Sequence, residues 1–298
     1  MQIRSFFAEY IPVFVKGILM GICDIIPGVS GGTVAFISGI YGRLISAVAH
    51  VSPLIIYDLL KWDLPAFRAR LLQMDVVFLF VLLAGIGSAF LIASRIMLWF
   101  LEEYPVLTNG FFFGLILASS VLLFAPLPHR YKGGYIFLIL GIILGLFIVM
   151  LNPAALGHSY PVLFITGFIA LCAMILPGIS GAYITLLMNQ YEYMLHAIKI
   201  LNLPDISAYL AGGVLGILTF TRLLKYLLKY YHDLIVAVLT GIMLGSSKLL
   251  LDRALEPAAS GSELIISVIA GILVVARRFD MEFRNNLLKS FLKLKKNE

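Results

Sequence analysis

Two copies of a Pro-Gly-x-Ser-Gly motif constrain the fold of this chain more than any other feature. The first copy is Pro-Gly-Val-Ser-Gly-Gly at 27–32, and the second is Pro-Gly-Ile-Ser-Gly-Ala at 177–182. The copies are 150 residues apart (177 − 27) in a chain of 298 residues, and the tyrosines that follow them, Tyr41 and Tyr191, keep the same spacing. Proline and glycine break helices, because proline lacks an N–H donor and glycine is conformationally free. The sequence therefore predicts two halves built on one plan, each with a break.

Both breaks lie in sequence that is apolar enough to enter a membrane. Hydrophobic residues make up 61% of the chain and charged residues 13%, which is typical of a multi-pass membrane protein. No charged residue occurs between Ile25 and Gly42 or between Ser159 and Tyr191. A break in hydrocarbon leaves backbone N–H and C=O groups unsatisfied, so breaks survive where they are packed in protein or line a cavity. We therefore predict that the two breaks form the working site.

The apolar segments predict an all-α polytopic membrane protein of two repeats. Residues 1–151 form the first repeat, with a broken helix hairpin at 10–51, an amphipathic surface segment at 52–75 and three transmembrane helices. Residues 152–279 form the second repeat, with a hairpin at 160–203 and three helices, and 280–298 form a basic cytoplasmic tail. The six predicted helices are 76–101, 105–125, 134–151, 205–228, 234–251 and 264–278.

The lysine and arginine residues predict the orientation in the plasma (inner) membrane. When the basic tail is placed in the cytoplasm, most of the 22 Lys and Arg residues fall on that side, and only Lys199 and Arg253 fall outside. Both termini are therefore expected in the cytoplasm. Three helices separate the hairpins, so the second repeat starts from the opposite face, and inverted repeats with broken helices are typical of secondary transporters. The positions of the charged residues do not distinguish a re-entrant hairpin from one that crosses the membrane twice, because both begin and end on the same side. We favour two re-entrant hairpins whose tips meet at the membrane midplane.

The helix that begins after each break is expected to bind an anion. Its first backbone N–H groups have no partner within the helix, and the positive end of its dipole faces the tip. Glycines allow a ligand to approach this backbone, hydroxyl groups add donors, and phosphate fits such a site. The predicted substrate-binding residues are glycine, hydroxyl, aromatic and basic residues at or near the tips: Gly28, Ser30, Gly31, Gly32, Thr33, Tyr41, Arg43, Arg95, Gly178, Ser180, Gly181, Tyr191 and Lys248.

Charged residues inside the apolar segments suggest how transport is driven. A charge within the bilayer is costly, so function is the default interpretation for Asp24 and Arg43. Asp24 and Glu192 are the candidate coupling acids, which would bind a proton or a sodium ion. The alternative for Arg95 and Lys248 is snorkelling to the outer headgroups, and the alternative for Glu192 is an ordinary solvated helix end.

The motifs resemble those of the bacterial and archaeal PopT polyprenyl-phosphate transporter family. The resemblance rests on Gly-Ile-Cys-Asp-Ile-Ile-Pro-Gly-Val-Ser-Gly-Gly-Thr at 21–33, Gly-Ile-Tyr at 39–41, and Leu-Pro-Gly-Ile-Ser-Gly at 176–181 with Gln-Tyr at 190–191. It covers essentially the whole chain. The resemblance implies a flippase that returns undecaprenyl phosphate, the lipid carrier of peptidoglycan precursors, from the outer to the cytoplasmic leaflet. The second copy has Met174 in place of Asp24 and Ala182 in place of Gly32, so an acidic role belongs to the first copy alone.

We therefore predict a transporter and not an enzyme. The phosphate would bind at the tips while the prenyl tail stays in lipid, and one repeat would rock against the other. An ion-coupled transporter of a small soluble anion is the alternative. The sequence has no metal-ligand spacing and no Ser-His-acid set that favours catalysis. No cofactor and no metal are predicted; the expected partners are polyprenyl phosphate and membrane lipids, with no nucleic acid, and the residues leave the oligomeric state open.

Overall fold

The computed structural model describes residues 2–25, 30–51, 55, 58, 61–125, 127, 133–153, 156–255 and 261–294. All regular secondary structure in these residues is helical, so the prediction of an all-α protein is confirmed. The first half consists of α1 (Gln2–Ile25), α2 (Gly31–Ile37), α3 (Tyr41–Ala49), α5 (Leu64–Gln73), α6 (Val76–Glu103), α7 (Pro105–Phe124) and α8 (Gly134–Val149). The second half consists of α9 (Tyr160–Ile175), α10 (Gly181–Leu187), α11 (Tyr191–Lys199), α12 (Leu203–Tyr230), α13 (His232–Ser246), α14 (Lys248–Ala254) and α15 (Gly261–Leu294).

Three helices of the first half recur in the second half with the same length, namely α2 as α10, α3 as α11 and α6 as α12. The bounds of α10 and α11 lie 150 positions after those of α2 and α3 (181 − 31 and 199 − 49). The bounds of α12 lie 127 positions after those of α6 (203 − 76 and 230 − 103), and both helices have 28 residues. The two spacings differ because α5 and the segment around it have no counterpart in the second half.

Two helix boundaries differ from the sequence prediction. The second limb of the first hairpin is not continuous: α2 and α3 are separated at 38–40 and bend by 118°. Helix α15 does not end at Arg278 but continues to Leu294, because residues 272–294 contain neither glycine nor proline to stop it.

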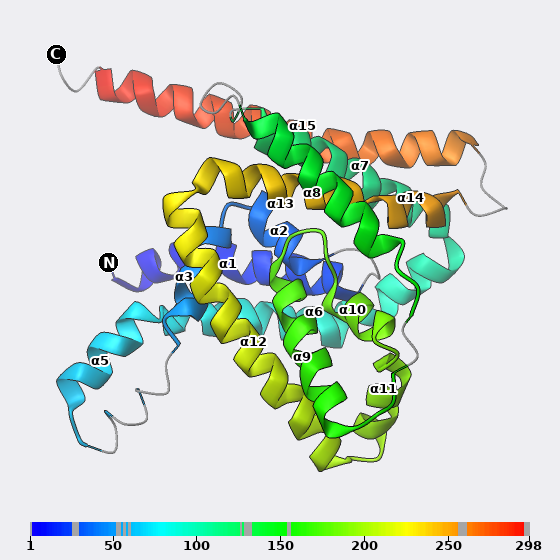
Figure 1. Ribbon diagram of the computed structural model, residues 1–298. Helices are drawn as coiled ribbons and strands as arrows, with labels where there is room; N and C mark the ends of the chain where they lie inside the picture. Colours follow the sequence, from blue (N-terminus) through cyan, green and yellow to red (C-terminus); the bar gives the residue numbers. More distant parts are fainter. Residues whose placement is uncertain are drawn as a thin grey trace.

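The long helices pack in pairs, and two of these pairs join the halves. Within each half, α1 packs on α6 and α9 packs on α12; α9 and α12 lie side by side in Figure 1. Between the halves, α7 packs on α15 and α8 packs on α13. Glycines allow this close approach: a Cβ atom on Gly114 of α7 would collide with the carbonyl oxygen of Val268 on α15, as expected for helices that pack through small residues in an apolar solvent.

The described helices make this chain a multi-pass membrane protein. Three are long and apolar enough to cross a membrane, namely α7, α12 and the α13–α14 segment (His232–Ala254). Two bent pairs, α2 with α3 and α5 with α6, raise this number to five if each pair counts as one span. Helix α5 projects from the other helices at the lower left of Figure 1 and has no buried residue.

Candidate functional site

The tips of the two hairpins are in direct contact. The backbone N–H of Gly178 in the second tip donates a hydrogen bond of 2.8 Å to Oγ1 of Thr33 in the first, and both groups are buried. The hydroxyl of Ser30 lies 3.4 Å from the carbonyl oxygen of Met174, at the end of α9. Residues 145 positions apart in sequence (178 − 33) therefore form one site.

In the first tip, protein groups occupy the backbone donors. The N–H of Gly31 donates to Oδ1 of Asp24 at 2.6 Å, and the N–H of Gly32 donates to the hydroxyl of Ser30 at 3.1 Å. A Cβ atom on Gly31 would lie 2.5 Å from the Asp24 carboxylate, so the close approach requires glycine. The carboxylate also stabilises the positive end of the α2 dipole. The Asp24 carboxylate therefore occupies the start of α2, where the sequence predicts a bound phosphate.

A second charge on α1 holds the other end of α2. The ammonium group of Lys16 donates a hydrogen bond of 2.9 Å to the carbonyl oxygen of Ser38, the residue that ends α2. A cation is favourable there because helix dipoles are negative at their C-terminus. Helix α2 therefore runs back along α1, as a hairpin requires. The equivalent positions in the second half hold Met174 and Thr166, so this pair of charges belongs to the first half alone.

The break after each short helix has the same hydrogen bonds in both halves. The N–H of Ile40 donates to the carbonyl oxygen of Ala35, and the N–H of Gln190 donates to the carbonyl oxygen of Thr185. Each is the hydrogen bond that closes the six-residue turn of a Schellman motif. The turn residues are Gly39, with φ of 75°, and Asn189, with φ of 56°. Glycine and asparagine are the residues that adopt this left-handed conformation most readily. The sequence predicted hairpins at 10–51 and 160–203 without these second breaks, for which Gly39 and Asn189 are the signal.

The second tip is built differently from the first. Gly178 has φ of 89°, and a Cβ atom there would lie 2.7 Å from the Cα of Met243 on α13. Ser180 is buried and makes no side-chain cap to α10. Beside the tip, a mainly apolar groove of about 300 Å³ is lined by residues that include Met174, Gly181, Ala182, Tyr191 and Tyr209. The second tip thus combines an uncapped helix start with an apolar groove.

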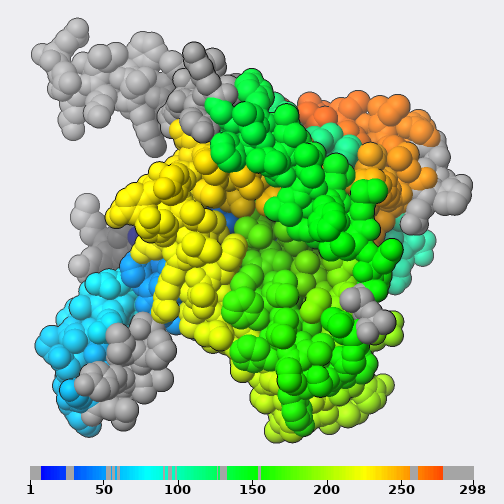
Figure 2. Space-filling view, in the orientation of Figure 1, coloured from blue at the N-terminus to red at the C-terminus, as the bar shows by residue number. Residues whose placement is uncertain are grey.

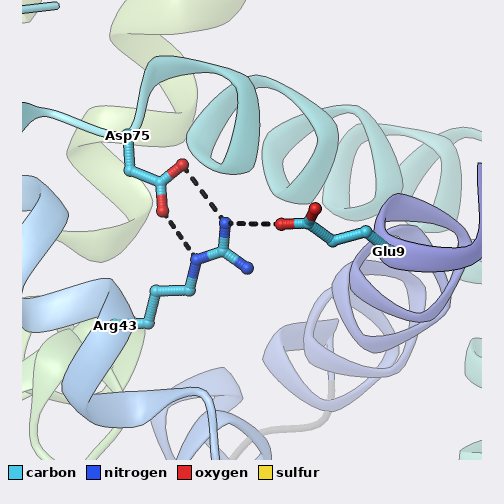
Figure 3. A network of polar contacts seen from close by, with 3 residues as sticks. All are labelled: Glu9, Arg43 and Asp75. Atoms are coloured by element: carbon cyan, nitrogen blue, oxygen red, sulfur yellow. Dashed lines mark hydrogen bonds and ion pairs between the residues drawn. The ribbon is translucent and has the colours of Figure 1, made fainter. Parts of the chain in front are cut away.

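Arg43 binds two carboxylates rather than a tip residue (Figure 3). Its Nε lies 2.6 Å from Oδ2 of Asp75 and its Nη2 lies 3.2 Å from Oδ1 of Asp75 and 3.4 Å from Oε1 of Glu9. Its guanidinium carbon also lies 4.4 Å from the centre of the Phe78 ring. Such a bidentate pair ties α3 to α1 and to the start of α6. Substrate binding by Arg43 stays a prediction.

The remaining predicted site residues lie in several places. Tyr41 is buried at the start of α3, Tyr191 lines the apolar groove, and Glu192 is exposed on α11. Lys248 forms an ion pair with Asp252 one helical turn away on α14. Arg95 lies on α6, and Gly28 falls outside the described residues. The structure therefore gathers Ser30, Gly31, Gly32, Thr33, Gly178, Ser180 and Gly181 at the tips.

The two paired tips lie within the part of the chain that matches a known family. Residues 20–256 match the family model described as undecaprenyl phosphate translocase-like. The chain belongs to this family. It is 37% identical over 239 residues to a polyprenyl-phosphate transporter of Vibrio cholerae, covering 80% of this chain and 76% of that protein. It is 28% identical over 252 residues to a polyprenyl-phosphate transporter of Staphylococcus aureus, covering 78% and 82%.

Membership of the undecaprenyl phosphate translocase-like family confirms the resemblance that the motifs indicated. Both relatives are transporters and not enzymes, which confirms the predicted class of protein. No solved structure matches this chain. The matched range includes α2, α3, α9 and α10, so the family plan extends over both hairpins.

Proposed function

We propose that this protein returns undecaprenyl phosphate from the outer to the cytoplasmic leaflet and holds its phosphate at the paired tips. The family and its named relatives make it a polyprenyl-phosphate transporter. The observation that carries the position of the phosphate is the hydrogen bond between Gly178 and Thr33, which brings the two glycine-rich breaks together. Hydroxyl and amide groups of both halves lie together there, and once released from their present partners they can replace the water of a phosphate headgroup.

Asp24 is the part of this site that can couple binding to an ion. In the described state its carboxylate accepts the hydrogen bond of the Gly31 N–H, at the place where a phosphate oxygen would bind. Two anions compete for one donor, so a proton or a sodium ion on Asp24 would release the amide to the phosphate. Return of the carboxylate to Gly31 would then expel the headgroup. The bound ion and the phosphate would in this way move together.

The apolar groove beside the second tip favours a lipid substrate. It opens next to Gly181, so a phosphate at the tip would have its prenyl tail in an apolar channel. An apolar lining would not contribute to the binding of a small soluble anion. We further propose that the two halves are inverted in the membrane, with both termini in the cytoplasm; the distribution of the Lys and Arg residues along the chain supports this orientation.

The proposal can be tested in liposomes that contain the protein and a labelled polyprenyl phosphate, by following the fraction of label accessible from outside. We expect the wild-type protein to move the label, and Thr33→Val to reduce the rate roughly tenfold, because a lost buried hydrogen bond costs about 1 to 3 kcal/mol. Ser207→Ala is the matched control, since Ser207 is exposed and bonds only within its own helix turn. Movement by the wild-type protein that is no faster than in empty liposomes would reject the function. Equal rates for Thr33→Val and Ser207→Ala would reject the site.

A further inference from the structure

A second cavity lies away from the tips, between α3 and the junction of α12 with α13; its lining is mainly apolar, but two lysines reach it. It has a volume of about 460 Å³ and is lined by residues of 36–46 on one side and of 225–236 on the other. We call it the α3–α12 cavity. Figure 2 shows α3, in blue, reaching the surface beside α12, in yellow. Helix α2 separates this cavity from Gly31 by its own length of about 10 Å.

The α3–α12 cavity carries positive charge that the described residues do not neutralise. Lys225 and Lys229 both line it. The ammonium group of Lys225 lies 2.8 Å from Nε2 of His50, and that of Lys229 lies 5.2 Å from the centre of the Tyr230 ring. Among the described residues, no carboxylate forms an ion pair with either lysine. Two cations beside an open cavity attract an anion.

Tyr41 adds an observation that is independent of the lysines. Its side chain lines the cavity and is only 4% exposed. Its hydroxyl is buried and has no hydrogen-bond partner among the described residues, whereas its ring packs edge-on against Phe36 at 5.1 Å between centroids. A buried hydroxyl is normally paired. An oxygen-rich ligand in the cavity would supply the missing partner.

The charge of the cavity is confined to one half of the molecule. At the equivalent positions of α6, 127 residues earlier, Lys225 is replaced by Leu98 and Lys229 by Glu102. The repeated helix plan therefore does not require lysine at these positions. Because only one half has lysines at these positions, we expect the cavity to act at one face of the membrane. Positive charge next to a membrane-spanning helix is typical of the cytoplasmic face.

We propose that the α3–α12 cavity is a second phosphate site, which binds the headgroup of a prenyl phosphate between the tips and the cytoplasmic water. This inference rests on the proposed function, because it takes the substrate to be a lipid phosphate. Lys225 and Lys229 attract the phosphate oxygens, and the Tyr41 hydroxyl donates a hydrogen bond to one of them. Inorganic phosphate has the same chemistry, so the test must separate the two sources.

The test compares variants of the whole protein in lipid nanodiscs, with a short-chain prenyl phosphate as the probe. We expect Lys229→Glu, which introduces the residue found at position 102, to weaken binding at least tenfold, and Tyr41→Phe to weaken it severalfold. Lys199→Ala on α11 is the matched control and should bind like the wild-type protein, because Lys199 is exposed and does not line the cavity. Tyr41→Phe keeps the ring, so a folding defect is not expected; a melting temperature for each variant checks this.

Four results would decide the inference. Displacement of bound prenyl phosphate by inorganic phosphate, but not by the prenyl alcohol, would support a site for the headgroup. Binding of inorganic phosphate without binding of the lipid would assign the cavity to the free anion and overturn the proposal. Wild-type transport and binding in Lys229→Glu, Tyr41→Phe and a Lys225→Ala/Lys229→Ala double variant would also overturn it, while leaving the proposed function intact. Lack of lipid transport by the wild-type protein would instead reject the proposed function, and this inference with it.

Discussion

Single charged residues in this protein act mainly by fixing the ends of helices. Asp24 and Lys16, both on α1, hold the start and the end of α2, and Arg43 joins α3 to the residue that precedes α6. An arginine that is bound bidentately to Asp75 has fewer donors to offer a phosphate. The charged residues therefore fall into two groups: those that position the hairpin, and those, such as Lys225 and Lys229, to which the described part of the chain offers no acidic partner.

The role of Arg43 can be decided by comparing Arg43→Gln with Asp75→Asn. If the ion pair only positions α3, both variants should lower stability by about 1 to 3 kcal/mol, because each removes a charge-assisted bidentate pair; Arg43→Gln should lower it more, because it also loses the contacts with Glu9 and the Phe78 ring. Thermal unfolding in detergent measures this, and transport per folded protein should then be equal in both. A much larger loss of transport in Arg43→Gln than in Asp75→Asn would instead make Arg43 a ligand of the phosphate.

At the scale of elements, the short helices α2 and α10 are the least expected feature. A seven-residue helix is too short to be stable alone, so each depends on its caps. In both halves the helix ends in a left-handed turn residue, Gly39 or Asn189, which redirects the chain into the next helix. Because of this turn, an apolar segment that the sequence predicts as one helix forms two helices.

Gly39→Ala tests this turn without any change in packing. An added Cβ atom at Gly39 meets nothing within 4 Å, so its cost is the backbone strain of a positive φ, about 1 to 2 kcal/mol. We expect a lower melting temperature in detergent. Asn189→Gly is the matched change at the equivalent turn and should be neutral or slightly stabilising, because glycine adopts positive φ freely. A drop of similar size in both variants would contradict this account of the turn.

Some elements of the fold could be predicted from the sequence, and others could not. Pro177 and Gly178 interrupt an apolar run, so the break before α10 and its copy in the first half could be predicted. The pairing of Arg43 with Asp75, 32 residues apart, could not, because any nearby carboxylate would serve. The partners of α7 and α8 could not be predicted either, because small residues occur on many apolar helices and pairing depends on which of them meet.

For the whole molecule, the main result is that the two halves are interlocked. Helix α7 packs on α15, and α8 packs on α13, so each half contributes a helix to a pair with the other. A division of the chain near residue 151 would separate both pairs.

A disulfide between α7 and α15 tests whether such a pair moves as a unit. A Cβ atom on Gly110 would lie 3.3 Å from the Cβ of Ser267, close to the distance that a disulfide spans. We expect the Gly110→Cys/Ser267→Cys variant, with Cys23 and Cys172 replaced by alanine, to form the bond on oxidation and to keep at least half of its transport rate. A loss of transport on oxidation that a reductant reverses would mean that α7 and α15 slide past each other.

This interlocking changes what can move during transport. Rocking of one repeat against the other would require both shared pairs to come apart, whereas the pairs α1–α6 and α9–α12 each belong to a single half. A motion that keeps both shared pairs intact would therefore have to shift these two pairs relative to α7, α8, α13 and α15, and it would also change the contact between α3 and α12. The hinges of such a motion would be the short connections at Tyr104 and Tyr231, where α6 joins α7 and α12 joins α13.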